Sequence, residues 1–596
     1  MSVLDRIERL RNVMEQQKID CYIIPTDDYH HSEYVGDYFK FREYITGFTG
    51  SAGTAVFTKD KAGLWTDGRY FIQAEAQLQG SGITLYKSGE PGVPTIEEFL
   101  KSELKEGDVL GFDGRTVTYA QGKRYCHIAD ENGASLKYSL DFAQNIWKER
   151  PEMSMESVFS LADEYTGEKI GSKLERIREI MKENGCNAHV LSSLDDIAWL
   201  LNIRGNDIAY CPLVLSYAIV YNNSVELFAD IRKFSDDIIN LLAENQVKIY
   251  PYEDIYRKVS EMTSEDKLLL DSAIMNYSLY QAISKETVIV DKQNPEILMK
   301  SVKNETQAEN LRKAHLKDAV AHTKFMYWLK KNIGRVEITE LSASARLEGL
   351  RAEQEHFLGP SFGPISAYGE HGAIVHYSAD EKSNVPLKEG KLFMTDTGGH
   401  YLEGSTDITR TVALGEVGNI EKEHFTLVAR AMLRLANTVF LYGCSGANLD
   451  CIAREVFWKE GLNFNHGTGH GVGYLLNIHE GPINFRWKDG ERPAPALEEN
   501  MVITDEPGIY IEGSHGIRLE NELLVRKTVK NEYGQFMNFE ILTYVPIDLD
   551  AILPEKMSTE EKEMLNHYHK QVYEKVSPYL SEEERIWLKE YTRAVK

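Results

Sequence analysis

Several features are scarce in this sequence of 596 residues, and each scarcity excludes a class of protein. No apolar run approaches the roughly 18 residues that a bilayer-spanning helix needs, so we expect no membrane segment. The first twenty residues are charged and amphipathic, so we expect no secretory signal peptide there. Basic residues number 67 against 92 acidic ones, and the resulting net charge of −25 argues against binding to nucleic acid.

Cysteine is also scarce, with six residues and no C-x-x-C pair in the whole chain. This usage is typical of free thiols in a reducing compartment and predicts a cytoplasmic protein. Proline is modest at 17 residues, and aromatic residues make up 10% of the chain, which indicates packed cores rather than disorder. The length allows two to four domains at roughly 100–200 residues each.

An internal repeat organises the first half of the chain. The stretch that starts at Leu4 and the stretch that starts at Leu174 share an apolar helical period, a polar break, a short apolar run and a paired acidic turn. Later in each copy, LWTDGRYF at 64–71 matches LFADIRKF at 227–234. The repeat predicts two similar α/β domains at 1–155 and 156–300.

The third region, 301–596, begins with a helix. Asn304 and Gln307 have the spacing of a capping box, and Gly334 ends the apolar period that follows. Beyond it we expect glycine-rich turns, strands, one more helix near 423–440 and two short helices in the charged tail. Residues 393–410 also match 502–520, which predicts two related β-hairpins and a pseudo-twofold domain.

Each of these hairpins carries two acidic residues beside apolar neighbours, and the four are Asp396, Asp407, Glu506 and Glu520. A single such residue is most simply a solvated hairpin residue. Four on two matched hairpins would leave unpaired negative charge if they converged, and divalent cations are the usual remedy.

Histidines supply possible nitrogen ligands close to these acids. NHGTGHGVG, residues 465–473, has too many glycines for a stable helix, so His466 and His470 must project from a strand or loop. His479 follows closely, and His376 precedes the first hairpin on what we expect to be an apolar strand. Mixed oxygen and nitrogen ligands suit two metal ions about 3.5–4 Å apart that activate a water, and the carboxylate excess favours Mn²⁺ or a similar hard ion.

These motifs resemble the pita-bread metallopeptidases, which include methionine aminopeptidase, prolidase and aminopeptidase P. GFTGSAGTAVF and LWTDGRYF look like the creatinase-type N-terminal domain of the last two. Three domains over the whole chain, the first two alike, are similar to the cytosolic long form of Xaa-Pro aminopeptidase. The resemblance implies two creatinase-type α/β domains followed by a pseudo-twofold pita-bread catalytic domain with a C-terminal helical tail.

The resemblance also implies a role for each site residue. Asp407 and Glu520 would bridge two Mn²⁺ ions, with Zn²⁺ or Co²⁺ as alternatives, and Asp396 would bind one ion. His470 and Glu506 would bind the other ion, and Glu506 would also accept a proton from the bridging water. Substrate would be contacted by His376, His466, His479, Arg518 and Arg69, of which His376 and His479 are also expected to be catalytic.

The implied activity is release of the residue before a penultimate proline, by a metallo-exopeptidase that is expected to be a homodimer. The alternative enzyme is a prolidase, which cleaves Xaa-Pro dipeptides, and the non-catalytic alternative is a peptide- or protein-binding module. This sequence departs from the common pattern at Glu370 and His371, where small or amide residues are usual.

Overall fold

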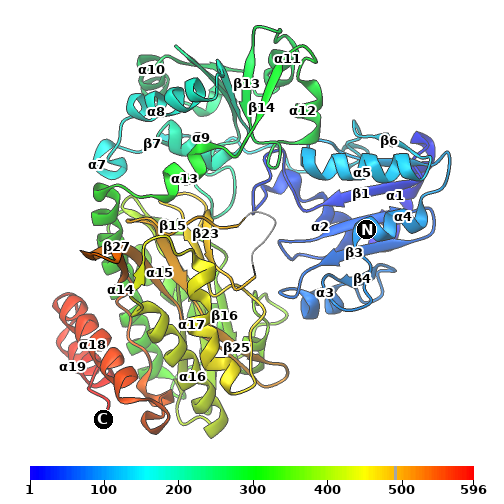
Figure 1. Ribbon diagram of the computed structural model, residues 1–596. Coiled ribbons are helices and arrows are strands. Elements are labelled where there is room, and N and C mark those ends of the chain that lie inside the picture. Colours follow the sequence, from blue (N-terminus) through cyan, green and yellow to red (C-terminus); the bar gives the residue numbers. More distant parts are fainter. Residues whose placement is uncertain (489–492) are drawn as a thin grey trace. The chain divides into compact units, whose positions relative to one another are not determined.

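The computed structural model describes residues 1–488 and 493–596, and its chain divides into two compact units (Figure 1). Unit 1 comprises Met1–Leu161 and Glu168–Glu296, and unit 2 comprises Ala162–Gly167 and Ile297–Lys596. Among the described residues, no helix has both the length and the apolar character needed to cross a bilayer.

Unit 1 contains two six-stranded sheets with the same topology. Their strand orders are β4-β3-β2-β1-β5-β6 and β12-β11-β10-β8-β13-β14. In each sheet three central strands are antiparallel and the remaining neighbours pair in parallel. The repeat in the sequence therefore corresponds to two copies of one α/β fold.

The first helix of each copy shows why the sequence folds this way. α1 (Val3–Gln17) begins at a capping box between Ser2 and Asp5 and buries Ile7, Leu10 and Met14 at helical spacing. Its counterpart α8 (Ile170–Glu183) buries one face in the same way.

The strands of unit 1 are β1 (Cys21–Pro25), β2 (Thr54–Thr58), β3 (Ala62–Thr66), β4 (Thr84–Lys87), β5 (Val109–Phe112), β6 (Ser135–Lys137), β7 (Phe159–Ser160), β8 (Ala188–Leu191), β9 (Ile203–Arg204), β10 (Tyr217–Tyr221), β11 (Val225–Phe228), β12 (Val247–Tyr250), β13 (Lys267–Leu270) and β14 (Val288–Asp291). Its other α-helices are α2 (Phe41–Thr46), α3 (Phe71–Gln77), α4 (Ile96–Glu103), α5 (Tyr119–Glu131), α6 (Ala143–Ile146), α9 (Leu194–Leu200), α10 (Asp236–Glu244), α11 (Asp254–Ser260) and α12 (Tyr277–Ala282). α13 (Pro295–Ser301) runs from unit 1 into unit 2.

Unit 2 begins with the predicted long helix, α14 (Glu305–Asn332). Asn304 and Gln307 form the reciprocal capping box, so that prediction is confirmed. α14 buries Ala321 and Phe325 in one large apolar core, which it shares with the strands and with α16 (Asn419–Ala436).

The two matched segments form the predicted hairpins. In the first, β17 (Lys391–Thr397) pairs with β20 (Ile408–Leu414), and β18 (Gly399–Tyr401) pairs with β19 (Gly404–Ser405) between them. In the second, β24 (Val502–Asp505) pairs with β27 (Asn521–Asn531), with β25 (Gly508–Ile511) and β26 (His515–Arg518) between them. In both hairpins, therefore, a second antiparallel strand pair lies between the two strands of the first pair.

The remaining strands of unit 2 are β15 (Phe357–Pro360), β16 (Ile365–Tyr368), β21 (Phe440–Leu441), β22 (Gly469–Val472), β23 (His479–Phe485) and β28 (Gly534–Ile541). They complete the sheets β15-β18-β19, β16-β17-β20 and β21-β28-β27-β24-β22-β23.

Three expectations for unit 2 were wrong. Two helices were missed, α15 (Glu340–Ala352) and α17 (Gly446–Lys459), and the helix expected at 423–440 runs from Asn419 to Ala436. His376 does not lie on a strand. The short η3 helix (Gly369–Ala373) follows β16 at Gly369, where φ is +58°, and the chain then turns at His376.

The tail forms two helices, α18 (Thr559–Val576) and α19 (Glu582–Tyr591). Unit 2 also contains the short helix α7 (Asp163–Thr166). The predicted pair of tail helices is present, although α18 is longer than expected. Tyr327 of α14 hydrogen-bonds Glu583 of α19 at 2.8 Å, so the tail packs on unit 2 itself (Figure 1).

Candidate metal centre

The first hairpin holds two of the predicted acidic residues on neighbouring strands. Asp396 lies on β17, opposite Thr409 of β20, and Asp407 immediately precedes β20. Both are buried, with side-chain exposures of 11% for Asp396 and 4% for Asp407.

The second hairpin contributes the other two acidic residues. Glu506 immediately follows β24, and Glu520 lies between β26 and β27. The amide of Glu520 donates to the Thr409 carbonyl at 3.0 Å, and the Thr409 hydroxyl donates to the Glu520 carboxylate at 2.8 Å. The two hairpins are thus hydrogen-bonded to each other where their acidic residues lie.

The glycine-rich motif forms β22, which carries His470. A Cβ atom on Gly469 would lie 1.9 Å from the Thr504 carbonyl oxygen, and one on Gly471 would lie 2.2 Å from that of Glu480. Only glycine permits β22 to approach both neighbouring strands so closely. This approach brings His470 Nε2 to 3.5 Å from Asp407 and 3.7 Å from Glu506.

The structure brings together all five residues predicted as metal ligands. Three groups have ligand atoms mutually within 4.8 Å; they are Asp396, Asp407 and Glu520; His470, Glu506 and Glu520; and Asp407, His470 and His479. Glu520, Asp407 and His470 each belong to two groups, so the groups overlap, as they would around two neighbouring ions. We call the five predicted ligands, Asp396, Asp407, His470, Glu506 and Glu520, the ligand cluster.

Raised pKa values show that bringing these carboxylates together disfavours their ionised forms. Burial and the neighbouring Asp396 charge raise the pKa of Asp407 to about 7. Burial also raises the pKa of Glu506, and burial with the Asp407 charge raises that of Glu520 well above its usual range. Without compensating cations, the cluster would have to take up protons.

Arg518 supplies one compensating positive charge. It is buried, and its guanidinium lies 2.5 Å from Asp396 and donates to the Tyr510 hydroxyl at 2.8 Å. Tyr510 in turn lies 2.8 Å from Nε2 of His466, whose pKa is lowered to about 3 by burial and by Arg518. A neutral His466 therefore accepts from Tyr510 and donates from Nδ1 to the Gly467 carbonyl.

The residues present fit a pair of divalent cations. Four carboxylates face one buried arginine, so net negative charge remains after that pairing. Oδ1 of Asp396 is buried and, among the described residues, has no hydrogen-bond partner. A carboxylate oxygen buried in this way suits a metal ligand.

Two residues that support the ligand cluster, Glu522 and His315, were not predicted from the sequence. Glu522 accepts from the Asp407 amide at 2.7 Å, and Nε2 of His315 lies 3.1 Å from the other oxygen of Glu522. All of these side chains are buried. The available signal was Glu522 itself, an acidic residue in the apolar strand that follows Glu520.

Of the other predicted site residues, His479 shares a ligand group with Asp407 and His470. His479 begins β23, and its ring centroid lies 4.3 Å from that of His470. Val375, next to His376, accepts from the Arg518 guanidinium at 3.4 Å. Arg69 lies in unit 1 after β3, where it pairs with Asp67 at 2.8 Å.

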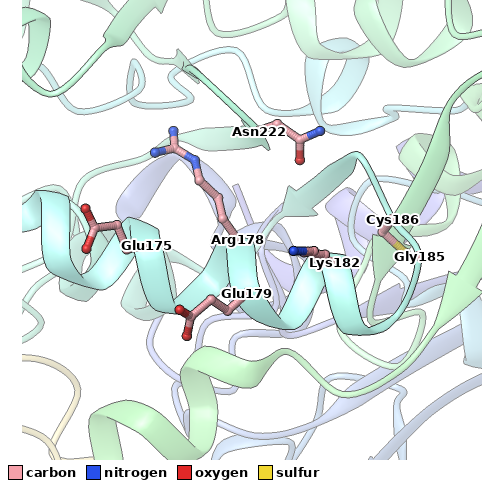
Figure 2. A pocket seen from close by; sticks show the side chains of 7 residues that line it. All are labelled: Glu175, Arg178, Glu179, Lys182, Gly185, Cys186 and Asn222. Atoms are coloured by element: carbon pink, nitrogen blue, oxygen red, sulfur yellow. The ribbon is translucent and has the colours of Figure 1, made fainter.

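An open surface pocket in unit 1 contains none of the predicted site residues. Figure 2 shows its lining, which is Glu175, Arg178, Glu179, Lys182, Gly185, Cys186 and Asn222. Most of these come from α8 and carry charges of both signs. The pocket offers no carboxylate–histidine grouping and adds nothing to the ligand cluster.

Comparison with known families places the ligand cluster in a recognised domain. The model of metallopeptidase family M24 matches residues 309–527, and that of the C-terminal region of peptidase M24 matches 535–595. Two models of the creatinase/prolidase N-terminal domain match 6–137 and 149–307. The chain belongs to metallopeptidase family M24.

Within that family its similarity to one kind of enzyme extends over the full length. Xaa-Pro aminopeptidase 1 of Dictyostelium discoideum is 36% identical over 97% of this chain and 94% of that protein. Aminopeptidase P1 of Arabidopsis thaliana is 34% identical over 99% of both. The crystal structure of X-prolyl aminopeptidase from Caenorhabditis elegans, described as a cytosolic enzyme with a di-nuclear active site, matches all of both chains at 33% identity and a TM-score of 0.95.

These matches confirm three predictions from the sequence. One is the resemblance to Xaa-Pro aminopeptidases, and another is the enzyme class, a metallopeptidase of that kind. The third is the fold class, two related creatinase-type domains followed by a pita-bread catalytic domain.

Proposed function

We propose that this chain is a metal-dependent Xaa-Pro aminopeptidase, which hydrolyses the bond between an N-terminal residue and a following proline. The observation that carries the proposal is the ligand cluster, complete in a chain that matches such enzymes from end to end. A binding module that had lost its chemistry would have no need to keep five ligands together, three of them buried.

Different residues of the ligand cluster would bind the metal ions and transfer the proton. Two cations, when bound, would supply Lewis-acid activation of the attacking water and of the scissile carbonyl. Asp396 would hold one and His470 the other, while Asp407 and Glu520 would lie between them. Glu506, with 19% of its side chain exposed, would accept the proton of the attacking water.

The neighbouring histidines and arginines complete the proposed site. His479 adjoins Asp407 and His470, where it would stabilise the oxyanion that forms at the carbonyl. His376 and neutral His466 would contact the peptide. Arg518 would hold Asp396 and Tyr510 in place and would line the proline side of the peptide site. Arg69 would bind the peptide from the other subunit of the proposed homodimer.

We propose Mn²⁺ as the resident metal, in a pair. Four of the five ligands are carboxylates, and oxygen-rich sites favour harder ions over Zn²⁺. Loading the metal-stripped protein separately with Mn²⁺, Zn²⁺ and Co²⁺ tests this assignment. We expect Mn²⁺ to restore the highest kcat/KM, and a higher value with Zn²⁺ would overturn it.

We also propose a cytoplasmic homodimer that acts on peptides. The support for location is the sparse, unpaired cysteine and the description of the Caenorhabditis elegans enzyme as cytosolic. The homodimer rests on family likeness, and light scattering of the purified protein would measure it.

A paired peptide assay tests the activity and its alternatives. The protein is stripped with a chelator, reloaded with Mn²⁺ and given Ala-Pro-Ala, Ala-Pro and Ala-Ala-Ala. We expect release of alanine from Ala-Pro-Ala and no cleavage of Ala-Ala-Ala, since the site selects proline. Cleavage of Ala-Pro alone would identify a prolidase, and no cleavage at all would favour the binding module.

A further inference from the structure

A buried carboxylate outside the ligand cluster holds the segment that carries His376. Glu340, the first residue of α15, is fully buried and accepts four hydrogen bonds. Its donors are the Tyr368 amide at 2.8 Å, His371 Nδ1 at 2.8 Å, the Tyr377 hydroxyl at 2.9 Å and the Val385 amide at 3.4 Å. The helix N-terminus adds a favourable field for this negative charge.

Two of these donors lie on either side of His376. His371 and Tyr377 stack on each other, with ring centroids 4.5 Å apart. Glu340 therefore joins the two ends of a short turn, 371–377, whose backbone has no strand pairing to hold it.

The middle of the same turn is joined to the ligand cluster. The Val375 carbonyl accepts from both terminal nitrogens of Arg518 at 3.4 Å, and Arg518 contacts Asp396 at 2.5 Å. Gly372 also packs against Gly516 of β26, where a Cβ atom on Gly516 would lie 1.6 Å from the Gly372 carbonyl oxygen. The turn is thus fixed at its ends by Glu340 and at its centre by Arg518.

His371 is the unusual member of this arrangement. It is the only one of the four donors to Glu340 with an ionisable imidazole, and 21% of its side chain is exposed. Glu340 raises its pKa, chiefly through the hydrogen bond between them. Glu370 and Lys391 are the other charged groups close enough to affect it.

We propose that His371, with Glu340 and Tyr377, is a positioning residue, which fixes the turn bearing His376 for peptide binding. The inference rests on the proposed aminopeptidase activity. None of the three residues belongs to the ligand cluster, so their loss should weaken peptide binding without releasing metal.

Steady-state kinetics of the full-length, Mn²⁺-loaded protein on Ala-Pro-Ala test the proposal. We expect His371→Ala to raise KM about five- to tenfold, the size of one lost hydrogen bond, with a smaller change in kcat and unchanged metal content. His371→Asn, whose amide nitrogen can replace Nδ1 as donor, should restore most of the loss. Tyr377→Phe removes a different donor to the same carboxylate and should shift KM in the same direction.

The matched control is His356→Ala. His356 Nδ1 makes an equivalent 2.8 Å contact with Glu403 in the same unit, away from the 371–377 turn, and its loss should leave KM unchanged. Wild-type KM in His371→Ala, or metal lost along with activity, would overturn the proposal. If His371→Ala does not fold, Tyr377→Phe decides by the same criterion. Failure of the proposed function is a separate result, because the wild type would then not cleave Ala-Pro-Ala.

Discussion

At the scale of single residues, the centre of unit 2 is a group of carboxylates that cannot all be ionised without cations. The raised pKa values of Asp407, Glu506 and Glu520 all follow from burial and mutual repulsion. Replacing one of these residues by a neutral side chain should therefore leave the protein folded. The change should instead lower catalytic activity.

Glu506→Gln tests the proton acceptor. The amide keeps the shape of the side chain but cannot take a proton, so we expect turnover to fall by about two to four orders of magnitude with an unchanged circular dichroism spectrum. The control is Glu512→Gln, an exposed residue of the same hairpin, which should keep wild-type activity. Substantial turnover by Glu506→Gln would remove this residue from its role.

Arg69→Ala tests the peptide-binding role of unit 1. We expect a higher KM with metal content unchanged, because Arg69 does not belong to the ligand cluster. The repeat provides a matched control in Arg232, which pairs with Asp230 as Arg69 pairs with Asp67. Arg232→Ala should behave as wild type, and equal effects of the two changes would contradict a specific role for Arg69.

The residues of the ligand cluster were predictable because their signal is local. An acidic residue between apolar neighbours stands out in the sequence, and two such hairpins matched each other. Glu340 and His315 give no such signal, because their partners are distant in sequence. The prediction that His376 lies on a strand was wrong. The apolar residues around it belong to a turn that side-chain hydrogen bonds hold in place.

At the scale of elements, β22 depends on glycine. Gly469→Ala would place a methyl group 1.9 Å from the Thr504 carbonyl, so β22 would have to move and take His470 with it. We expect loss of metal binding and of activity. Gly349→Ala in α15 meets nothing within 4 Å, so it should keep activity and stabilise the helix by up to about 1 kcal/mol. Full metal binding by Gly469→Ala would contradict this view of β22.

The stability of unit 2 should depend on pH through His569, a buried residue of helix α18. His569 is fully buried, its Nε2 accepts from the Ile547 amide at 3.1 Å, and burial lowers its pKa to about 3. Because the unfolded histidine has a pKa of about 6.5, the unfolded state binds more protons below that value, and stability falls as pH decreases from 7 toward 3.

His569→Gln removes this titration. The wild type should lose about 2 kcal/mol between pH 7 and pH 5 through this group, and the variant should lose correspondingly less. The urea unfolding midpoint of unit 2, followed at both pH values, measures the difference. Identical pH dependence in the two proteins would show that His569 is not held neutral.

In unit 2, a familiar signal at the helix start made one helix predictable, and its absence hid two others. α14 was found from its Asn304–Gln307 box. α15 and α17 also have capping boxes, but the third helical positions are Ser342 and Asn448, which do not have the usual Glu or Gln. Glycines within their sequences further obscured the helical period, and burial of Leu347 and Val456 against the core overrides that weak propensity.

At the scale of the whole molecule, the repeat in the first half was visible because each copy preserves its helix, strand and acidic turn. The strand order within each sheet could not be read the same way, since β1 pairs with β2 and also with the distant β5. The pairing of Glu520 with Thr409 across the two hairpins of unit 2 is equally non-local. These contacts depend on tertiary packing rather than on neighbouring residues.

Metal titration of the chelator-stripped, full-length protein, followed by peptide hydrolysis, tests the central claim most directly. Calorimetry should detect about two Mn²⁺ ions per chain, and release of alanine from Ala-Pro-Ala should return as these sites fill. A protein that binds no Mn²⁺ and stays inactive after its addition would contradict the account.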